Sequence, residues 1–124
     1  MDIFEYIDVN GNSPFNTWLC GLKDLRTQAK IDTRIDRASL GNIGDTKSVG
    51  EGVQEMRISY GKGYRVYYGH IDVDTIIVLL CGGDKSSQTK DIKKAKQYWL
   101  ELKTELKHEQ ETKESQREFI REIE

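Results

Sequence analysis

Four stretches of the chain are apolar or alternate between apolar and polar residues, as β-strands do. They are residues 3–8, 55–60, 64–69 and 75–81. The last stretch is apolar on both faces, which is typical of a central strand. Gly61-Lys62-Gly63 and Asp72-Val73-Asp74 separate the last three stretches and predict hairpin turns. We therefore expect an N-terminal strand and, later in the chain, an antiparallel three-stranded meander.

Apolar residues spaced by three and four positions predict three helices. Ser13 and Pro14 are an N-cap and a first residue for the first helix, and Gly41 is a C-terminal stop for the second, expected over residues 28–40 as an antiparallel hairpin with the first. The third should begin near Ser86 or Ser87. The buried stripes, in order, are Phe15, Trp18, Leu19 and Leu22; Ile31, Ile35 and Ala38; and Ile92, Ala95, Trp99, Leu102 and Leu106.

The order of these elements predicts an α+β fold in a single domain over residues 1–106. Residues 107–118 contain no apolar side chain, so residues 107–124 are expected to form a charged helical or flexible extension. Residues 42–52 are rich in glycine and show neither the helical nor the strand periodicity. This predicts a surface loop, which could be functional or simply a connection.

Composition narrows the class of protein. The 124 residues are 36% hydrophobic and 32% charged, no apolar run approaches the length of a membrane span, and the N-terminus lacks the features of a secretory signal. Two cysteines form no disulfide framework, so we expect a cytoplasmic protein with free thiols. The net charge of −2 is uneven, because residues 101–124 carry 5 Lys and Arg against 8 Asp and Glu. Five lysines between residues 85 and 96 leave room for a local basic patch.

Two arginines on the meander are the first candidate site. If residues 61–63 form a three-residue loop, Ile58 pairs with Val66, and Arg57 and Arg65 become diagonal neighbours on the opposite face, with Cβ atoms roughly 7–8 Å apart. A similar loop at 72–74 would place Cys81 opposite Arg65. Two guanidinium groups suit a phosphodiester, whereas an ordinary solvent face neutralised by Glu55 or Glu51 is the simpler interpretation.

The second candidate is the segment from Cys81 to Gln88, where the last strand leads into a helix N-terminus that favours anions. It differs from a nucleotide phosphate loop because Asp84 separates Gly83 from Lys85 and the preceding glycine is missing. The histidines are isolated and the acidic residues show no metal-ligand spacing, so we expect neither a metal nor another cofactor.

A longer series of residues resembles a known family. It comprises Phe15, Trp18, Leu19 and Leu22; Ala29, Lys30, Ile31, Arg34, Ile35 and Arg37; Gly41, Asn42, Gly44 and Asp45; residues 49–53 with Glu55, Met56, Arg57 and Ile58; and the segments 63–68 and 80–88. In this order, the motifs resemble the RelE/ParE toxin superfamily, in its HigB-like, phage-derived "addiction module killer protein" branch. The resemblance covers roughly residues 1–103.

The resemblance implies a RelE-like fold and the toxin of a type II toxin–antitoxin pair. Its partners would be a cognate antitoxin, of helix-turn-helix type, the ribosome with its mRNA, and DNA through the toxin–antitoxin complex. RelE-like and HigB-like members cleave mRNA, whereas ParE-like members inhibit DNA gyrase. We expect a metal-independent, ribosome-dependent mRNA endoribonuclease, with a gyrase inhibitor, or a degenerate relative that only binds its antitoxin and DNA, as the alternatives.

Carried over residue by residue, the resemblance assigns Arg65 to the scissile phosphate, Lys85 to the basic position after the last strand, and Arg57 to a basic strand position. The tyrosine and histidines that some relatives use in catalysis have no counterpart in the matching segments. Asp84 or a lysine is therefore the expected base and Lys85 the acid. Lys62 and Lys90 join Arg57 and Arg65 as expected RNA contacts.

Overall fold

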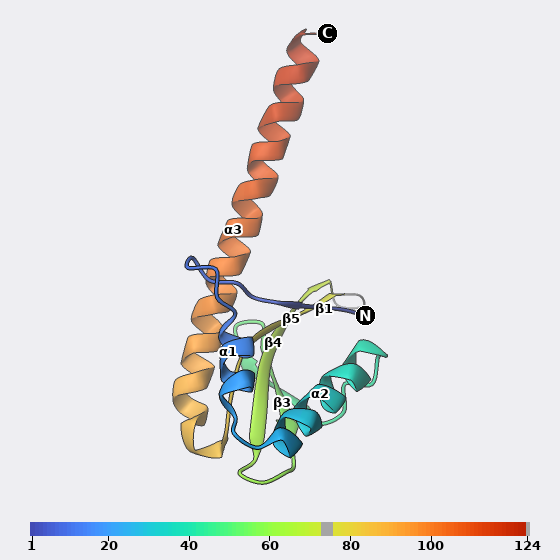
Figure 1. The fold of residues 1–124 in the computed structure, drawn as a ribbon. Helices are drawn as coiled ribbons and strands as arrows, with labels where there is room; N and C mark the ends of the chain where they lie inside the picture. The colour runs from blue at the N-terminus through green and yellow to red at the C-terminus, as the bar shows by residue number, and fades with distance from the viewer. Residues whose placement is uncertain (73–75, 124) are drawn as a thin grey trace.

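The computed structural model describes residues 1–72 and 76–123, and for Ile76 and residues 112–123 it describes the backbone only. The fold is α+β, as the sequence predicts (Figure 1). The predicted turn at 72–74 lies partly outside the described residues. The elements in chain order are β1 (Asp2–Glu5), α1 (Pro14–Gly21), α2 (Leu25–Ser39), β2 (Thr46–Gly50), β3 (Val53–Ile58), β4 (Tyr64–Asp72), β5 (Ile76–Gly83), the 3₁₀ turn η1 (Lys85–Ser87) and α3 (Gln88–Ile123).

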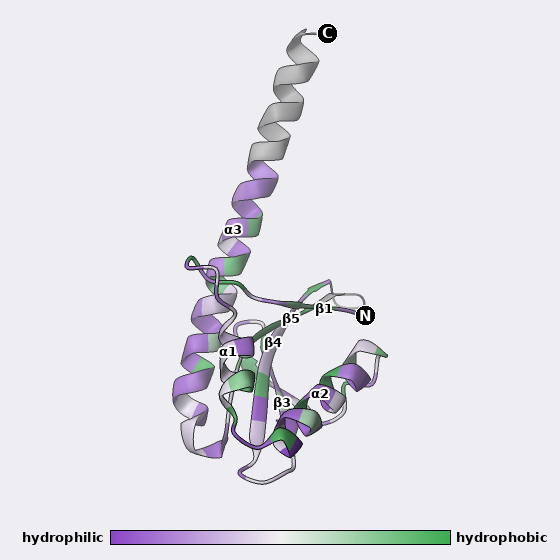
Figure 2. Ribbon diagram, in the orientation of Figure 1, coloured by the Kyte–Doolittle hydropathy of each residue, from purple (hydrophilic) through white to green (hydrophobic). Residues whose placement is uncertain are grey.

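One five-stranded sheet forms the centre of the domain, in the order β1-β5-β4-β3-β2. Strands β3, β4 and β5 are the predicted antiparallel meander, while β1 pairs with β5 in parallel and makes the sheet mixed. The central position of β5 follows from its sequence, because a strand covered on both faces needs apolar side chains on both. Figure 2 shows this contrast between the hydrophobic β5 and the mostly hydrophilic described part of α3.

Helices cover both faces of the sheet. On one face α1 packs on β5 and α2 lies against β3, with Ile31, Met56 and Val66 fully buried between them. On the other face α3 packs on β4 and β5 through Ala95 and Trp99. Gly69 in β4 makes room for Trp99, because a Cβ at that position would lie 2.6 Å from the ring atom Cζ3.

Local capping explains where the first two helices begin. The Ser13 hydroxyl accepts a hydrogen bond from the Asn16 amide at 3.0 Å and Pro14 opens α1, as predicted. Helix α2 begins earlier than expected because Asp24 caps it, accepting from the Arg26 amide at 2.9 Å. Gly41 follows the helix with a φ of 91°, which confirms it as the stop.

The prediction of a loop over residues 42–52 is wrong, because residues 46–50 form strand β2. This strand is the edge of the sheet and is exposed at four of its five positions, so it lacks the apolar alternation that marks a buried strand. Its glycines supply the hairpin to β3: Gly50, Glu51 and Gly52 all have positive φ angles. Pairing with β3, which the local sequence does not reveal, makes the segment a strand.

The predicted register between β3 and β4 is also wrong, by two residues. Ile58 pairs with Tyr64 rather than Val66, and Arg57 pairs directly with Arg65. The turn is longer than three residues because Tyr60 is drawn out of the ladder, its amide donating to the Ile58 carbonyl at 2.8 Å. A register shift by an even number of residues leaves every side chain on its predicted face of the sheet. Similarly, Cys81 lies opposite Tyr67 and not Arg65, with a register shift after Tyr67.

Helix α3 runs without interruption from Gln88 to Ile123, past residue 106 where the sequence pattern placed the end of the domain (Figure 1). Its apolar stripe is buried at Ala95 and Trp99, while Leu106 is 38% exposed. Among the residues that the structure describes, no helix has the length and apolar character that crossing a membrane requires.

Candidate functional site

Arg57 and Arg65 stand directly opposite each other on the face of the sheet that carries α3. Two like charges at this spacing repel, and the pair is stable only with a counterion. Glu55, two residues before Arg57 on the same face of β3, supplies it. Its Oε1 accepts from Nε of Arg57 at 2.9 Å and lies 3.5 Å from Nε of Arg65.

Glu55 is fully buried, and each of its carboxylate oxygens has a partner. Oε2 accepts from the Nε2 amide of Gln88, the first residue of α3, at 2.9 Å. Burial alone would raise the pKa of this carboxyl, but the hydrogen bonds from Arg57 and Gln88 and the charge of Arg65 together hold it below its ordinary value. Glu55 therefore stays ionised and fixes the two arginines relative to the start of α3.

Arg65 is held at a second point by the turn that precedes it. Its Nη1 donates to the carbonyl of Gly63 at 2.8 Å, and the residue is only 8% exposed. A Cβ added to Gly63 would lie 3.5 Å from Nη1 of Arg65 and 3.7 Å from Cβ of Lys85, so these two side chains flank the same glycine. Lys85 follows β5 and is exposed, and it adds a positive charge beside Arg65.

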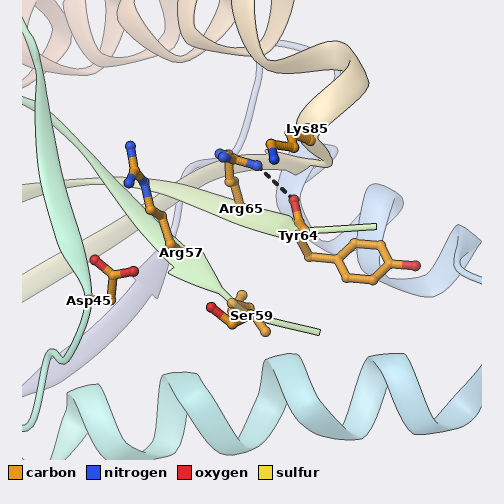
Figure 3. Close-up of a pocket in the computed structure, with 8 residues that line it drawn as sticks. Asp45, Arg57, Ser59, Tyr64, Arg65 and Lys85 are labelled. Atoms are coloured by element: carbon orange, nitrogen blue, oxygen red, sulfur yellow. Dashed lines mark hydrogen bonds between the residues drawn. The ribbon is translucent and has the colours of Figure 1, made fainter. Parts of the chain in front are cut away.

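These three cations line one cavity of about 240 Å³. Figure 3 shows the ends of the Arg65 and Lys85 side chains next to each other, with Arg57 beside them and the ring of Tyr64 directed away. Among the residues that the structure describes, none accepts a hydrogen bond from the terminal nitrogens Nη1 and Nη2 of Arg57. The complete lining is Asp45, Arg57, Ile58, Ser59, Gly63, Tyr64, Arg65 and Lys85.

A second basic groove, of about 320 Å³, continues from this cavity. The two share four lining residues: Asp45, Arg57, Ile58 and Ser59. The other residues that line the groove are Lys30, Thr33, Arg34 and Arg37 of α2, and Tyr60, which follows Ser59.

The other predicted site residues lie elsewhere. Asp84 is the cap of η1: its Oδ1 accepts from the amide of Ser86 at 2.8 Å and from the Ser86 hydroxyl. The hydrogen bond from the Ser86 hydroxyl is the main cause that lowers the pKa of Asp84. Lys62 and Lys90 are exposed, and neither lines the cavity that holds the arginines. The structure thus brings Arg57, Arg65 and Lys85 together in one cavity, which Asp84, Lys62 and Lys90 do not line.

The sequence indicated only that Glu55 could neutralise the arginines, and it did not identify Gln88 or Asp45 as site residues. The spacing of two residues between Glu55 and Arg57 places both on one face of β3, so this contact was open to prediction. Gln88 is 33 residues from Glu55 in the chain, and no local pattern marks it. Asp45 lies just before β2, the strand that the sequence pattern did not reveal.

The two guanidinium groups and the ammonium group can together bind an anion such as a phosphodiester. Among the side chains that the structure describes, no three of the histidine, cysteine and acidic types gather into a possible metal site. The buried Tyr67 lies on the same face, where burial and then the charges of Glu55 and Asp91 raise the pKa of its hydroxyl. That hydroxyl is enclosed and does not line the cavity.

Fold and site together define a small α+β protein with a fixed pair of arginines on one face of its sheet. The chain is 50% identical over 96 residues to an uncharacterized protein of Haemophilus influenzae, a match that covers 77% of this chain and 96% of that protein. The chain therefore belongs to the same protein family as this H. influenzae protein. No family model and no solved structure matches the chain.

Proposed function

We propose that the chain is the toxin of a type II toxin–antitoxin pair and cleaves RNA at the cavity between Arg57, Arg65 and Lys85. The observation that carries the proposal is the directly opposed arginine pair held by the buried Glu55 carboxylate. Cations fixed before the substrate arrives stabilise developing negative charge without reorganisation, which is the largest contribution to many enzymatic rates. The family resemblance adds the substrate class, translated mRNA, and a cytoplasmic site of action.

The proposed reaction needs no metal. The 2′-hydroxyl loses its proton to a base and attacks the adjacent phosphorus, the bond from phosphorus to the 5′-oxygen breaks, and a proton passes to that oxygen. The products are a 2′,3′-cyclic phosphate and a free 5′-hydroxyl. Arg57 and Arg65 would neutralise the phosphorane, and Lys85 would give the proton to the leaving oxygen.

Two carboxylates are candidates for the base, beside the lysine that the sequence also allowed. Asp84 was the carboxylate expected from sequence, but it is occupied as the cap of η1 and its pKa is lowered, mainly by the Ser86 hydroxyl. Asp45 is exposed and lines the cavity itself. Its position favours Asp45 over Asp84 as the group that takes the proton from the 2′-hydroxyl.

A second function is favoured by the role of Asp84 as the cap of η1. A ParE-like gyrase inhibitor needs no proton transfer, so it would tolerate a site in which the expected base serves as a helix cap. The same arginines would then bind protein or DNA instead of holding a scissile phosphate.

The deciding experiment is expression with and without the adjacent antitoxin gene. We expect growth arrest from the chain alone, rescue by the antitoxin, and primer extension stops within translated mRNA that end in cyclic phosphates. In a reconstituted translation assay, cleavage should survive EDTA at concentrations that leave ribosomes intact. Intact mRNA with blocked supercoiling by gyrase would establish the alternative, and normal growth at high expression would contradict both.

A further inference from the structure

The groove along α2 contains more positive charge than the fold requires. Lys30, Arg34, Arg37 and Arg57 line it against the single carboxylate of Asp45. Lys30 and Arg37 are exposed, and the described side chains give neither an ion pair with a carboxylate. Exposed cations without matching carboxylates on a concave surface, as Lys30 and Arg37 are, attract a polyanion.

Only part of this charge has a structural use. Arg34 is partly buried, donates from Nη2 to the Asp45 carbonyl at 3.2 Å, and so ties α2 to the segment before β2. Lys30 lies over the ring of Tyr60, with Nζ 5.6 Å from the ring centre. Arg37 lies in the last turn of α2, where a positive charge interacts favourably with the helix dipole. This interaction explains one of the charges but not why all four line the same groove.

The groove and the arginine cavity form one continuous track, because Asp45, Arg57, Ile58 and Ser59 line both. Arg57 is at the junction, with a side chain that is 37% exposed. A strand whose phosphate occupies the cavity between Arg57 and Arg65 would therefore continue past Arg57, around the end of β3, to α2 on the other face of the sheet. The aromatic ring of Tyr60, which also lines the groove, fits this occupant, since basic grooves with aromatic residues bind single-stranded nucleic acid.

We propose that the groove along α2 binds the phosphates next to the scissile one in a single strand of RNA, with Lys30 and Arg37 as the contacts. The inference rests on the proposed function, because it extends the path of the same substrate strand. It assigns Lys30 and Arg37 a role in binding and none in the proton transfers.

The test measures binding apart from cleavage. A fluorescent 12-nucleotide RNA with 2′-O-methyl groups cannot form the cyclic phosphate, so its anisotropy reports affinity alone. The variant Lys30→Ala/Arg37→Ala is compared with Lys23→Ala/Arg26→Ala, which removes two exposed charges outside the groove, one just before α2 and one in its first turn. Both pairs change the net charge equally, and thermal melting shows that each variant is folded.

The salt dependence gives the sharpest readout. Each phosphate contact on a single strand contributes about 0.7 to the slope of log K against log salt concentration. The Lys30/Arg37 variant should lose about 0.7–1.4 in slope and roughly tenfold or more in affinity at low salt, whereas the Lys23/Arg26 variant should match the unmodified chain. A dinucleotide analogue, whose single phosphate would occupy the arginine cavity, should bind both variants equally.

Equal losses in the two variants would overturn the inference, since the attraction would then be diffuse. Absence of any RNA binding by the unmodified protein would overturn it too, while cleavage of mRNA on the ribosome would still decide the proposed function separately. Retained RNA affinity combined with a weakened antitoxin complex would assign the groove to the protein partner instead.

Discussion

Arg57 and Arg65 are paired residues on adjacent strands, and Oε1 of Glu55 lies 2.9 Å from Nε of the first and 3.5 Å from Nε of the second. The two arginines thus face each other directly and not diagonally, and Glu55 neutralises them as the simpler interpretation expects. Arg65 is buried to 8% exposure on the side of the sheet that α3 covers. Substituting it should therefore affect both stability and function, and the two effects can be separated.

Arg65→Ala should lower RNA cleavage by about one to two decades, because it removes a charge-assisted contact to the phosphate. It should also lower the free energy of unfolding by about 1–3 kcal/mol, since the hydrogen bond to the Gly63 carbonyl and the ion pair with Glu55 are lost. Arg65→Lys should recover stability more than cleavage, because an ammonium cannot reproduce the guanidinium fork. Full cleavage by a folded Arg65→Ala protein would contradict the proposed site.

Glu55→Gln should lower the free energy of unfolding by about 3 kcal/mol at pH 7, because an amide placed between two guanidinium groups cannot replace the buried carboxylate. Glu105→Gln, on an exposed position of α3, is the matched control and should change the stability little. Equal stability of the Glu55 and Glu105 variants would show that the carboxylate does not hold the arginines.

The same carboxylate predicts a pH dependence. The pKa of Glu55 is depressed in the folded chain, against burial, by Arg57, Gln88 and Arg65, so its stabilisation is complete above the ordinary carboxyl pKa. It is lost as the pH falls through the lower, folded-state pKa. Denaturation by urea between pH 7 and pH 3 should show the difference between the unmodified chain and Glu55→Gln shrinking in acid. A difference that stays constant to pH 3 would contradict the assignment.

Asp84→Asn and Asp45→Asn separate the two candidate bases. Asparagine is as good an N-cap as aspartate, so Asp84→Asn should keep both the fold and the cleavage rate, whereas Asp84→Ala should cost about 1 kcal/mol of stability. Asp45→Asn should reduce cleavage by about 10²–10⁴ if Asp45 takes the proton. The measurement is single-turnover cleavage on ribosomes, and loss of cleavage in Asp84→Asn would return the role of base to Asp84.

The two thiols should differ in reactivity. Burial, and after it the charge of Asp91, raises the pKa of Cys81 to about 12, and Cys20 is exposed on α1. An aromatic disulfide reagent at pH 8 should therefore titrate one thiol in the native protein and two after denaturation. Substitution Cys20→Ser should remove the native reaction. Two rapidly reacting thiols in the native protein would show that α3 does not cover β5 as described.

The sequence by itself determined the elements whose patterns are local. Apolar alternation marked β3 and β4, and a stretch apolar on both faces marked β5. Ser13-Pro14 and Gly41 marked helix ends, because strand pattern and capping depend on neighbouring residues only. The same alternation placed Arg57 and Arg65 on one face, and that placement survived an error of two residues in the register.

Only the tertiary structure decided what covers that face and what fixes the arginines. Edge strand β2 has no apolar pattern, because its stability comes from pairing with β3. The contact between Glu55 and Gln88 spans 33 residues and forms only when α3 docks on the sheet. A buried carboxylate keeps its charge only where enough donors converge on it, and the convergence of Arg57, Arg65 and Gln88 on Glu55 is a product of the folded chain, not of any single segment.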